Sequence, residues 1–546
     1  MMRFLTFFKK ETTIAGILIA MILGLSLLPD IIKWQKTPPG RVYIPIHNNL
    51  YDYALYVNYI RQGLDGQSVL FDRFTTEEHQ GTLANPFYLV LGRIWRITGI
   101  RDAHIVYLIT RILLGLVWTL IVYGYIRRSI QSKTGRILAL FFVLYGASVP
   151  LFQWSEKGLT ISSFMAWWSE LDPLSRATFL PAHLMGHILL LLTITLFTFN
   201  YRISKTTFWR SSCMILGTIT GFFAGLFHTP SLTLPLLLLP IWAVLTKQWK
   251  RFVYLLILLP LSALSLLILS GQFQNMPWTL GWDYERLSFA VSFPEYLLAL
   301  GPIVPFAFLG VFVGNSTLKA RLVWILWIGI GFGALLVTPV LFQGQIAAFR
   351  SFPISNIRFL QLAINVPLSI LAGFALLEIR KRFGYALFYG LVGIVFILTF
   401  IGYPACLGTH ITNQFGGPLF QYPTRSWMEA IRTLDAGDRA KAVLSMPFAG
   451  LAIAMNTDRT VYIGRLTSTV NIDQKTDLAW KIYGGTMPVC EAYSLLTDNR
   501  ISEVFVGYDE KIAGGDLTVY PFLRLKQDFG DTQIYQFTGE KPAECP

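Results

Sequence analysis

The chain has 546 residues, of which 53% are hydrophobic and only 14% charged, and its mean hydropathy is +0.51. Soluble domains average about 25% charged residues, so this composition excludes an ordinary soluble protein and indicates one that crosses a membrane many times. The formal net charge of +14 is also typical of nucleic-acid binders. Its distribution along the chain gives a different explanation.

Eleven apolar runs are expected to span the membrane. They cover residues 12–29, 105–126, 137–152, 183–201, 211–228, 231–246, 252–270, 295–313, 322–341, 358–377 and 384–403. The first run lacks a small-residue cleavage site and is followed by proline and Asp30, which predicts a retained anchor rather than a signal peptide. The sequence therefore predicts an α-helical polytopic membrane protein, with a transmembrane domain over residues 1–422.

Lysine and arginine in the short loops predict the orientation. If the N-terminus lies inside, every inner segment is short and basic, and Glu11 and Glu378 are its only acids. This explains most of the positive charge without nucleic acid. It predicts a cytoplasmic N-terminus in the plasma (inner) membrane, and long outer segments at 30–104, 153–182, 271–294, 342–357 and beyond about 404.

The tail, residues 423–546, has 13 basic and 16 acidic residues, as an ordinary soluble domain would. Helices are expected at "TRSWMEAIRTL", "GLAIAMNT", "CEAYSLLTDNRI" and "YPFLRLKQDF", and strands at "KAVLSMP", "RTVYIG", "SEVFVGY" and "TQIYQF". This alternation predicts an extracytoplasmic α/β domain with a partly parallel sheet. Cys406, Cys490 and Cys545 lie on the outer side, where a disulfide can form, but the sequence does not determine a pairing.

The first outer loop opens with "NNLYDYALYVNYIRQG", in which Asp52, Tyr56, Tyr59 and Gly63 fall on one face of a predicted helix. Tyrosines favour the membrane–water boundary, so the helix is expected to lie in the interface plane. Asp52 then either presents its carboxylate at the mouth of the membrane domain or caps the helix. The two roles are compatible.

Further acids occur in the outer loops. Glu77, Glu78 and His79 form a compact cluster, although their spacing matches no established metal-ligand set, and a solvated loop is the alternative. The second outer loop combines tryptophans with charged side chains, an arrangement that suits sugar binding but also marks a membrane interface. Its polar residues are Glu156, Lys157, Glu170, Asp172, Arg176 and His183.

Three arginines stand out by their position. Arg358 begins a span on the outer side with Arg350 upstream, against the charge bias. A guanidinium there could bind a phosphate through paired hydrogen bonds or serve as an interfacial anchor. Arg111 is the one clear ionisable residue expected well inside a span, where it must face a partner or a cavity. An anion contact and a structural ion pair are both open for it.

Together these features resemble the GT-C superfamily of membrane glycosyltransferases, which includes protein O-mannosyltransferases, lipid A aminoarabinose transferases and oligosaccharyltransferases. The resemblance rests on the topology, on "YDYALYVNYIRQGLDGQSVLFDRFTTEEHQGTLANPFYLVLGRI" and on "RFLQLAINVPL". It implies an essential acid, matched by Asp52, and a second acid among Glu77, Glu78 and Glu156. It also implies an arginine on the donor phosphate, matched by Arg358.

The chain departs from the family in two places. Tyr53 follows Asp52, where mannosyltransferases have an adjacent acidic pair, and no WWDYG-type motif occurs. The second departure argues against oligosaccharyltransferase and favours transfer of a single sugar.

The function implied is inverting transfer of a sugar from a polyprenyl-phosphate donor to a glycan, lipid or protein acceptor on the outer face, with Asp52 as general base. Membrane lipids are expected partners, and neither nucleic acid nor a metal or other cofactor is expected. Alternatives are a flippase of lipid-linked glycans, which should carry charges through the membrane depth, and a non-catalytic envelope-assembly protein. Further candidate binding residues are Arg350, Arg111, Tyr56, His79 and Lys157.

Overall fold

The computed structural model describes residues 2–155, 158–165, 170–198, 207–281, 292–313, 318–342, 356–413 and 416–545. The chain divides into two compact units. Unit 1 contains Met1–Ile32, Ile109–Ile268 and Glu285–Asn413, and unit 2 contains Lys33–Leu108, Leu269–Tyr284 and Gln414–Pro546. The domain boundary expected between residues 422 and 423 stays a prediction.

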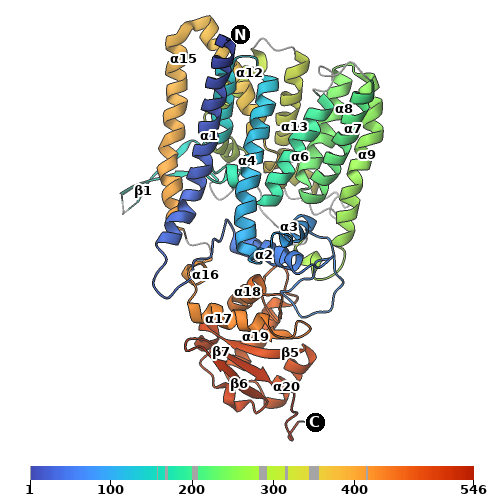
Figure 1. Cartoon of the computed structure of the whole chain (residues 1–546), viewed down its shortest axis with the longest axis vertical. Helices are drawn as coiled ribbons and strands as arrows, with labels where there is room; N and C mark the ends of the chain where they lie inside the picture. Colours follow the sequence, from blue (N-terminus) through green and yellow to red (C-terminus); the bar gives the residue numbers. More distant parts are fainter. Residues whose placement is uncertain are drawn as a thin grey trace. The chain divides into compact units, whose positions relative to one another are not determined.

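Unit 1 is a bundle of apolar helices (Figure 1). Among the described residues, five helices are long and apolar enough to cross a membrane, or six if one bent pair counts as a single span. The predicted α-helical membrane architecture is confirmed, and each of the eleven predicted runs contains a helix. The helices are α1 (Met2–Gln35), α4 (Ala103–Ser129), α5 (Lys133–Tyr145), α6 (Pro181–Thr198), α7 (Thr207–Phe227), α8 (Pro230–Leu245), α9 (Trp249–Gln272), α11 (Phe293–Leu300), α12 (Ile303–Phe312), α13 (Leu318–Phe342) and α15 (Asn365–Thr412).

Several of these runs are not the simple spans that hydropathy predicts. The run 295–313 breaks into α11 and α12, bent by 91°, because Gly301 adopts a positive φ of 83° and Pro302 cannot continue the helical hydrogen bonding. The runs 358–377 and 384–403 join in α15, which turns at Gly384. Residues Asn356–Leu360 form a 3₁₀ turn, η3, before α15 begins.

The second outer loop divides into two parts. Its first part forms a hairpin of β1 (Pro150–Ser155) and β2 (Gly158–Ser163). Residues 170–182 are then buried within unit 1 and include the 3₁₀ turn η1 (Arg176–Thr178). Arg176 makes burial of this segment possible, because its guanidinium donates hydrogen bonds to the carbonyls of Glu170, Val143 and Leu171.

Unit 2 begins with helix α2 (Leu50–Leu64), which packs on α3 (Pro86–Arg96). The two backbones approach closely where Gly63 meets Gly92. A methyl group on Gly63 would lie 2.3 Å from the carbonyl oxygen of Leu89 and 2.9 Å from the Cα atom of Gly92. Only glycine permits this close crossing. The position of α2 against α3 is therefore determined by backbone contact as well as by the apolar face of α2.

The tail folds into the predicted partly parallel sheet, with strand order β4-β3-β5-β7-β6. β3 pairs in parallel with β4 and β5, whereas β7 pairs antiparallel with β5 and β6. The strands are β3 (Ala442–Leu444), β4 (Thr460–Val461), β5 (Ile501–Val506), β6 (Leu523–Asp528) and β7 (Gln533–Phe537). The helices are α16 (Pro418–Gln421), α17 (Arg425–Asp435), α18 (Pro447–Asn456), α19 (Ile472–Tyr483), α20 (Val489–Asp498) and α21 (Tyr508–Ile512), with the 3₁₀ turn η4 (Leu517–Val519).

One element of the tail was assigned wrongly from the sequence. "YPFLRLKQDF" was expected to be helical, but most of it forms strand β6. Its antiparallel pairing with β7 decides the conformation, because a short apolar run has no strong local preference and takes the backbone partner that the fold offers.

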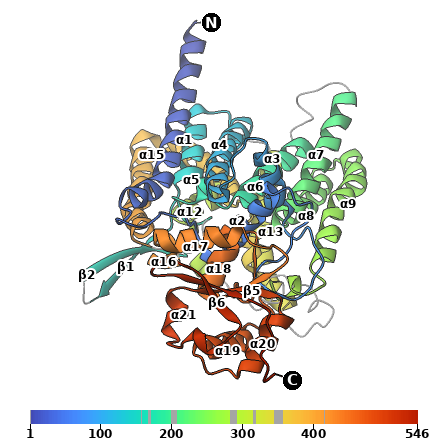
Figure 2. The same ribbon diagram turned by 60° about the horizontal axis from the view of Figure 1, so that its bottom comes forward.

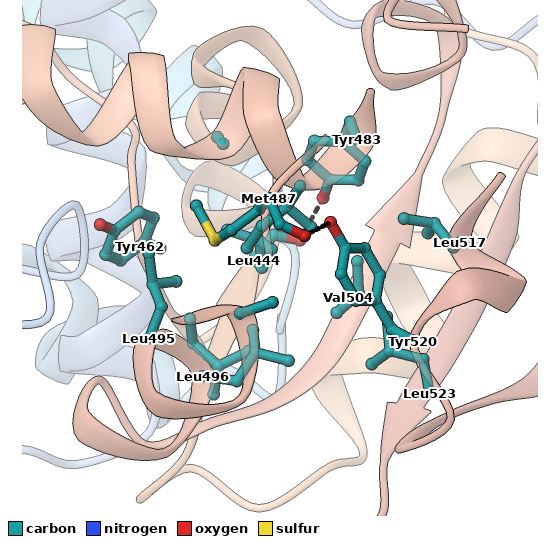
Figure 3. Packing of buried hydrophobic residues seen from close by; sticks show 14 of the residues in the cluster. Leu444, Tyr462, Tyr483, Met487, Leu495, Leu496, Val504, Leu517, Tyr520 and Leu523 are labelled. Atoms are coloured by element: carbon teal, nitrogen blue, oxygen red, sulfur yellow. Dashed lines mark hydrogen bonds between the residues drawn. The ribbon is translucent and has the colours of Figure 1, made fainter. Parts of the chain in front are cut away.

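Helices cover both faces of this sheet (Figure 2). On one face Phe505 meets Trp427 of α17 edge-on. On the other, Val504 belongs to a buried cluster with side chains of α19 and α20 (Figure 3). There the Tyr483 hydroxyl donates to the carbonyls of Leu444 and Phe505, so a buried tyrosine is satisfied by strand backbone.

The first outer loop and the tail are parts of the same unit. The amide of Val461 donates to the carbonyl of Arg73 at 2.9 Å, which covers the β4 edge of the sheet. The Arg73 side chain pairs at 3.0 Å with Asp458, which is buried. A disulfide joins Cys490 to Cys545, which resolves the pairing that the sequence left open, and Cys406 is a thiol in α15.

Candidate active site

The start of α2 places Asp52 in the first helical turn. Asn49 is the N-cap, since its side chain accepts a hydrogen bond from the Tyr51 amide at 2.8 Å. The capping alternative for Asp52 is therefore taken by another residue. An acid in the first turn still interacts favourably with the positive end of the helix dipole.

Arg465, from the loop after β4, holds Asp52. Its Nη2 donates to Oδ1 of Asp52 at 2.9 Å, and its Nε donates to the Tyr51 carbonyl at 3.1 Å. Two hydrogen bonds to adjacent residues fix the guanidinium. The Asp52 side chain is 38% exposed, and its Oδ2 has no hydrogen-bond partner among the described residues. One oxygen is thus held while the other is available to a substrate.

Behind this ion pair lies a buried acid, Asp72, that the sequence reasoning did not select. Its Oδ1 accepts the Phe74 amide at 2.9 Å, an Asx turn. Burial raises the pKa of Asp72, and the Phe74 amide, the charge of Arg465 and a hydrogen bond from Ser468 oppose that rise. The only signal in the sequence was "FDRF", in which Asp72 can form an Asx turn with the amide of Phe74. Such short segments are too common to identify a functional acid.

Two tyrosines extend this region. Tyr59 is buried, and burial together with the neighbouring Asp72 raises its pKa well above the usual value. Tyr56 stacks on Tyr88 with ring centroids 4.2 Å apart. The phenol rings therefore act as packing between α2 and α3 in this structure.

The Glu77–Glu78–His79 cluster connects the loop to the tail. Glu77 pairs at 2.7 Å with Lys475 of α19. Glu78 pairs at 2.5 Å with Arg500, and the side chains of Glu78 and Arg500 are both exposed. His79 Nε2 accepts the Asp72 amide at 2.9 Å, so Nδ1 carries the proton donated to the Glu77 carbonyl. Among the described residues no group of His, Cys, Asp or Glu side chains is placed to hold a metal ion.

Burial alone would raise the pKa of Glu77. Hydrogen bonds from Lys475 and Thr75, with the positive charge of Lys475, outweigh that effect and lower it. Lys475 is itself buried, and burial lowers its pKa against the opposing attraction of Glu77. This pair is a structural tie within unit 2.

The arginine candidates lie in unit 1. Arg111 is buried and pairs with Asp30 at 2.6 Å, the structural ion pair that the sequence left as one of two possibilities. Arg358 is half-buried on η3, and its Nη1 lies 3.4 Å from Oε1 of Gln361. Glu156, Lys157 and Arg350 lie outside the described residues.

Unit 1 also contains ionisable residues that sequence reasoning passed over. His187 is buried in α6, and His228 is buried between α7 and α8. His187 Nε2 lies 3.2 Å from Oε1 of Glu170 and 3.2 Å from the Gln361 carbonyl. Arg111 is therefore not the one ionisable residue inside a predicted span. A histidine in an apolar run was the missed signal.

No protein-family model matches the chain, and no curated protein matches it by sequence. Solved structures do match its fold. The oligosaccharyltransferase of Archaeoglobus fulgidus, tethered with an acceptor peptide, aligns with a TM-score of 0.53 and 12% identity over 97% of this chain and 74% of that chain. ArnT from Cupriavidus metallidurans bound to undecaprenyl phosphate aligns with a TM-score of 0.54 and 11% identity over 96% of this chain and 99% of that one.

The chain has a GT-C fold. Both neighbours are GT-C membrane glycosyltransferases, so the resemblance inferred from the sequence is confirmed at the level of the fold. A further match is AglB from Archaeoglobus fulgidus in complex with an inhibitory peptide and a dolichol-phosphate, with a TM-score of 0.50 and 13% identity over 97% of this chain and 75% of that one.

Proposed function

We propose that the protein is an inverting membrane glycosyltransferase that moves a sugar from a polyprenyl-phosphate donor to an acceptor on the outer face of the membrane. The observation that carries the proposal is Asp52, held through Oδ1 by Arg465 and half-exposed on the first turn of α2, in a chain with the GT-C fold. Structures with this fold bind undecaprenyl phosphate in ArnT and dolichol-phosphate in AglB. The proposed orientation has a cytoplasmic N-terminus in the inner membrane.

In this mechanism Asp52 accepts the proton of an acceptor hydroxyl through its available Oδ2. The hydroxyl oxygen attacks the anomeric carbon on the face opposite the phosphate. The bond from this carbon to the phosphate oxygen breaks, and its electron pair leaves with the lipid phosphate. The configuration therefore inverts in one step, and the proton remains on Asp52.

Arg358 is proposed to bind the phosphate and to offset the negative charge that develops on it as the sugar leaves. It is half-buried, which strengthens such an interaction relative to bulk water. Asp52 and Arg358 belong to different units of the chain, so each assignment is tested by its own variant.

The other candidates separate by their contacts. The pairs that Glu77 and Glu78 form with Lys475 and Arg500 favour a role in holding the first loop to the tail, and the Arg111–Asp30 pair favours a structural role for Arg111. Glu156, Lys157 and Arg350 stay sequence predictions. We propose no metal in the reaction.

The test is reconstitution of the purified chain in liposomes with radiolabelled polyprenyl-phosphate sugars and candidate acceptors. The proposal expects consumption of the donor, with release of the lipid phosphate and label on the acceptor. Movement of the donor across the bilayer without its consumption would indicate a flippase. Neither consumption nor movement would indicate a non-catalytic protein.

A further inference from the structure

A cluster of polar side chains lies inside the apolar bundle of unit 1, where three segments meet. α6 contributes His183 and His187, the turn between α7 and α8 contributes His228, η3 contributes Arg358, and Gln361 follows directly after η3. All three histidines and Gln361 are buried. Ionisable side chains at such a depth are costly and usually mark a binding or transport site.

Gln361 is at the centre of the cluster, because both of its oxygens accept hydrogen bonds. Its carbonyl lies 3.2 Å from Nε2 of His187, and its side-chain Oε1 lies 3.2 Å from Nε2 of His228. Nη1 of Arg358 approaches the same Oε1 at 3.4 Å. Two histidines on different segments therefore hold the residue that contacts Arg358.

These contacts also indicate where the histidine protons lie. A carbonyl oxygen only accepts, so Nε2 carries the hydrogen in both His187 and His228. Nδ1 of His228 then accepts from the Ser231 hydroxyl, 2.7 Å away. The result is an ordered chain, Ser231 to His228 to Gln361, that ends at the guanidinium of Arg358.

His183 differs from its neighbours. Its ring packs against that of His228, with centroids 4.3 Å apart, and against Phe179. His183 is only 8% exposed, yet its Nδ1 has no hydrogen-bond partner among the described residues. The His228 ring beside it is hydrogen-bonded to Oε1 of Gln361, the atom that Nη1 of Arg358 approaches. A buried ring nitrogen without a hydrogen-bond partner is rare in folded proteins and is the kind of group to which a ligand binds.

We propose that His183 is a second ligand of the donor phosphate beside Arg358, in a site that the Ser231–His228–Gln361 chain holds in place. The inference rests on the proposed function, since it takes Arg358 as a phosphate ligand. A phosphate oxygen selects the form of His183 with hydrogen on Nδ1 and accepts a charge-assisted hydrogen bond from it. Gln361 and His228 act through Arg358 and are positioning residues.

The charges around the cluster agree with an anionic ligand. Arg358 supplies the fixed positive charge. One carboxylate lies at the cluster, that of Glu170, whose Oε1 is 3.2 Å from Nε2 of His187. Arg176 is buried and donates to the Glu170 carbonyl at 2.7 Å, which adds a second positive charge near this acid.

The experiment measures binding of undecaprenyl phosphate without a sugar to the full-length protein in nanodiscs. His183→Leu removes the donor and is expected to weaken binding about 10- to 100-fold, the usual effect of losing a hydrogen bond to a charged group. Thr220→Val is the matched control, because it removes a buried polar group that bonds Thr193 and Gly217 and does not touch the cluster. It should bind as the wild type does.

Two isosteric variants keep the test decisive if His183→Leu does not fold. His183→Asn keeps an N–H at the position of Nδ1, whereas His183→Gln moves it to the position of Nε2. Only the glutamine variant is expected to lose affinity. Equal binding by the two variants, or wild-type binding by a folded His183→Leu, overturns the proposal.

The outcome for Arg358→Ala separates this inference from the function on which it rests. If Arg358→Ala loses binding while the His183 variants do not, only the inference fails. If Arg358→Ala also binds normally, the phosphate role of Arg358 fails. If the His183 variants weaken binding of the sugar-bearing donor alone, His183 contacts the sugar, and the proposal is overturned.

Discussion

Replacing Asp52 by asparagine should abolish most of the activity while leaving the fold nearly unchanged. The change keeps the shape of the side chain and removes its charge and basicity. A positioned general base contributes roughly 10²- to 10⁴-fold to a rate, so kcat/KM for sugar transfer should fall by about that factor. Binding of the donor should change little, because Asp52 is assigned to the acceptor hydroxyl.

The stability cost of this change follows from the local contacts. The Asp52–Arg465 pair is 2.9 Å long, and the Asp52 side chain is 38% exposed, so solvent screens it and it contributes about 0.2–1 kcal/mol. The favourable position of the acid in the first turn of α2 adds about 0.3–1 kcal/mol. The total, roughly 0.5–2 kcal/mol, is smaller than the loss of stability of about 5 kcal/mol or more that would be needed to unfold most of the protein and so explain a 10²-fold loss of activity.

The assay combines transfer of a radiolabelled sugar in proteoliposomes with thermal unfolding of the same preparation in detergent. Asp102→Asn is the matched control. Asp102 caps α4 by accepting the amides of His104 and Ile105, a role that asparagine fills as well. Asp52→Asn with full transfer at normal expression would refute the base assignment. So would a loss of activity that only follows the fraction of unfolded protein.

Three further outcomes concern stability. Glu77→Gln should reduce the pH dependence of stability, because the pKa of Glu77 is lowered in the fold: its ion pair stabilises the fold above the unfolded pKa of about 4.3 and loses this effect as pH falls through the folded pKa. In urea unfolding the stabilities of wild type and Glu77→Gln should therefore converge on acidification, and divergence would contradict the linkage, whereas Glu78→Gln, at an exposed pair, should cost at most about 1 kcal/mol at pH 7. Gly63→Ala should destabilise unit 2 by about 1–3 kcal/mol or more through overpacking. Thermal unfolding should show this loss against the control Gly124→Ala, whose added methyl group meets nothing within 4 Å, and equal melting temperatures would refute the close crossing. Cys490→Ser, which opens a disulfide over a sequence separation of 55 residues, should cost up to about 4 kcal/mol by chain entropy, and an unchanged melting temperature in non-reducing buffer would show that the bond does not form.

Local chemistry was enough to predict the membrane class, the helices of the bundle and most strands of the tail. The length of an apolar run and the alternation of apolar and polar residues can be read from neighbouring residues. Apolar runs form the predicted helices because a helix in a membrane satisfies its backbone hydrogen bonds within its own segment. Asp52 was selected as a candidate for the same reason, because an acid beside tyrosines in an amphipathic helix is visible within one turn. Strand β6 was missed because its pairing with β7 is not encoded in its own residues.

The roles of charged residues depended on partners that are distant in the chain. Asp52 meets Arg465, Glu77 meets Lys475, and Arg111 meets Asp30, at separations that no local pattern specifies. The buried histidines were overlooked because hydropathy averages a single polar residue into its apolar neighbours. Composition and periodicity thus determined that this is a membrane protein and which outer-loop acids are candidates. Only the tertiary structure decided the partner of each charged residue, because Coulomb attraction and hydrogen bonding act over a few ångströms in space, whatever the separation along the chain.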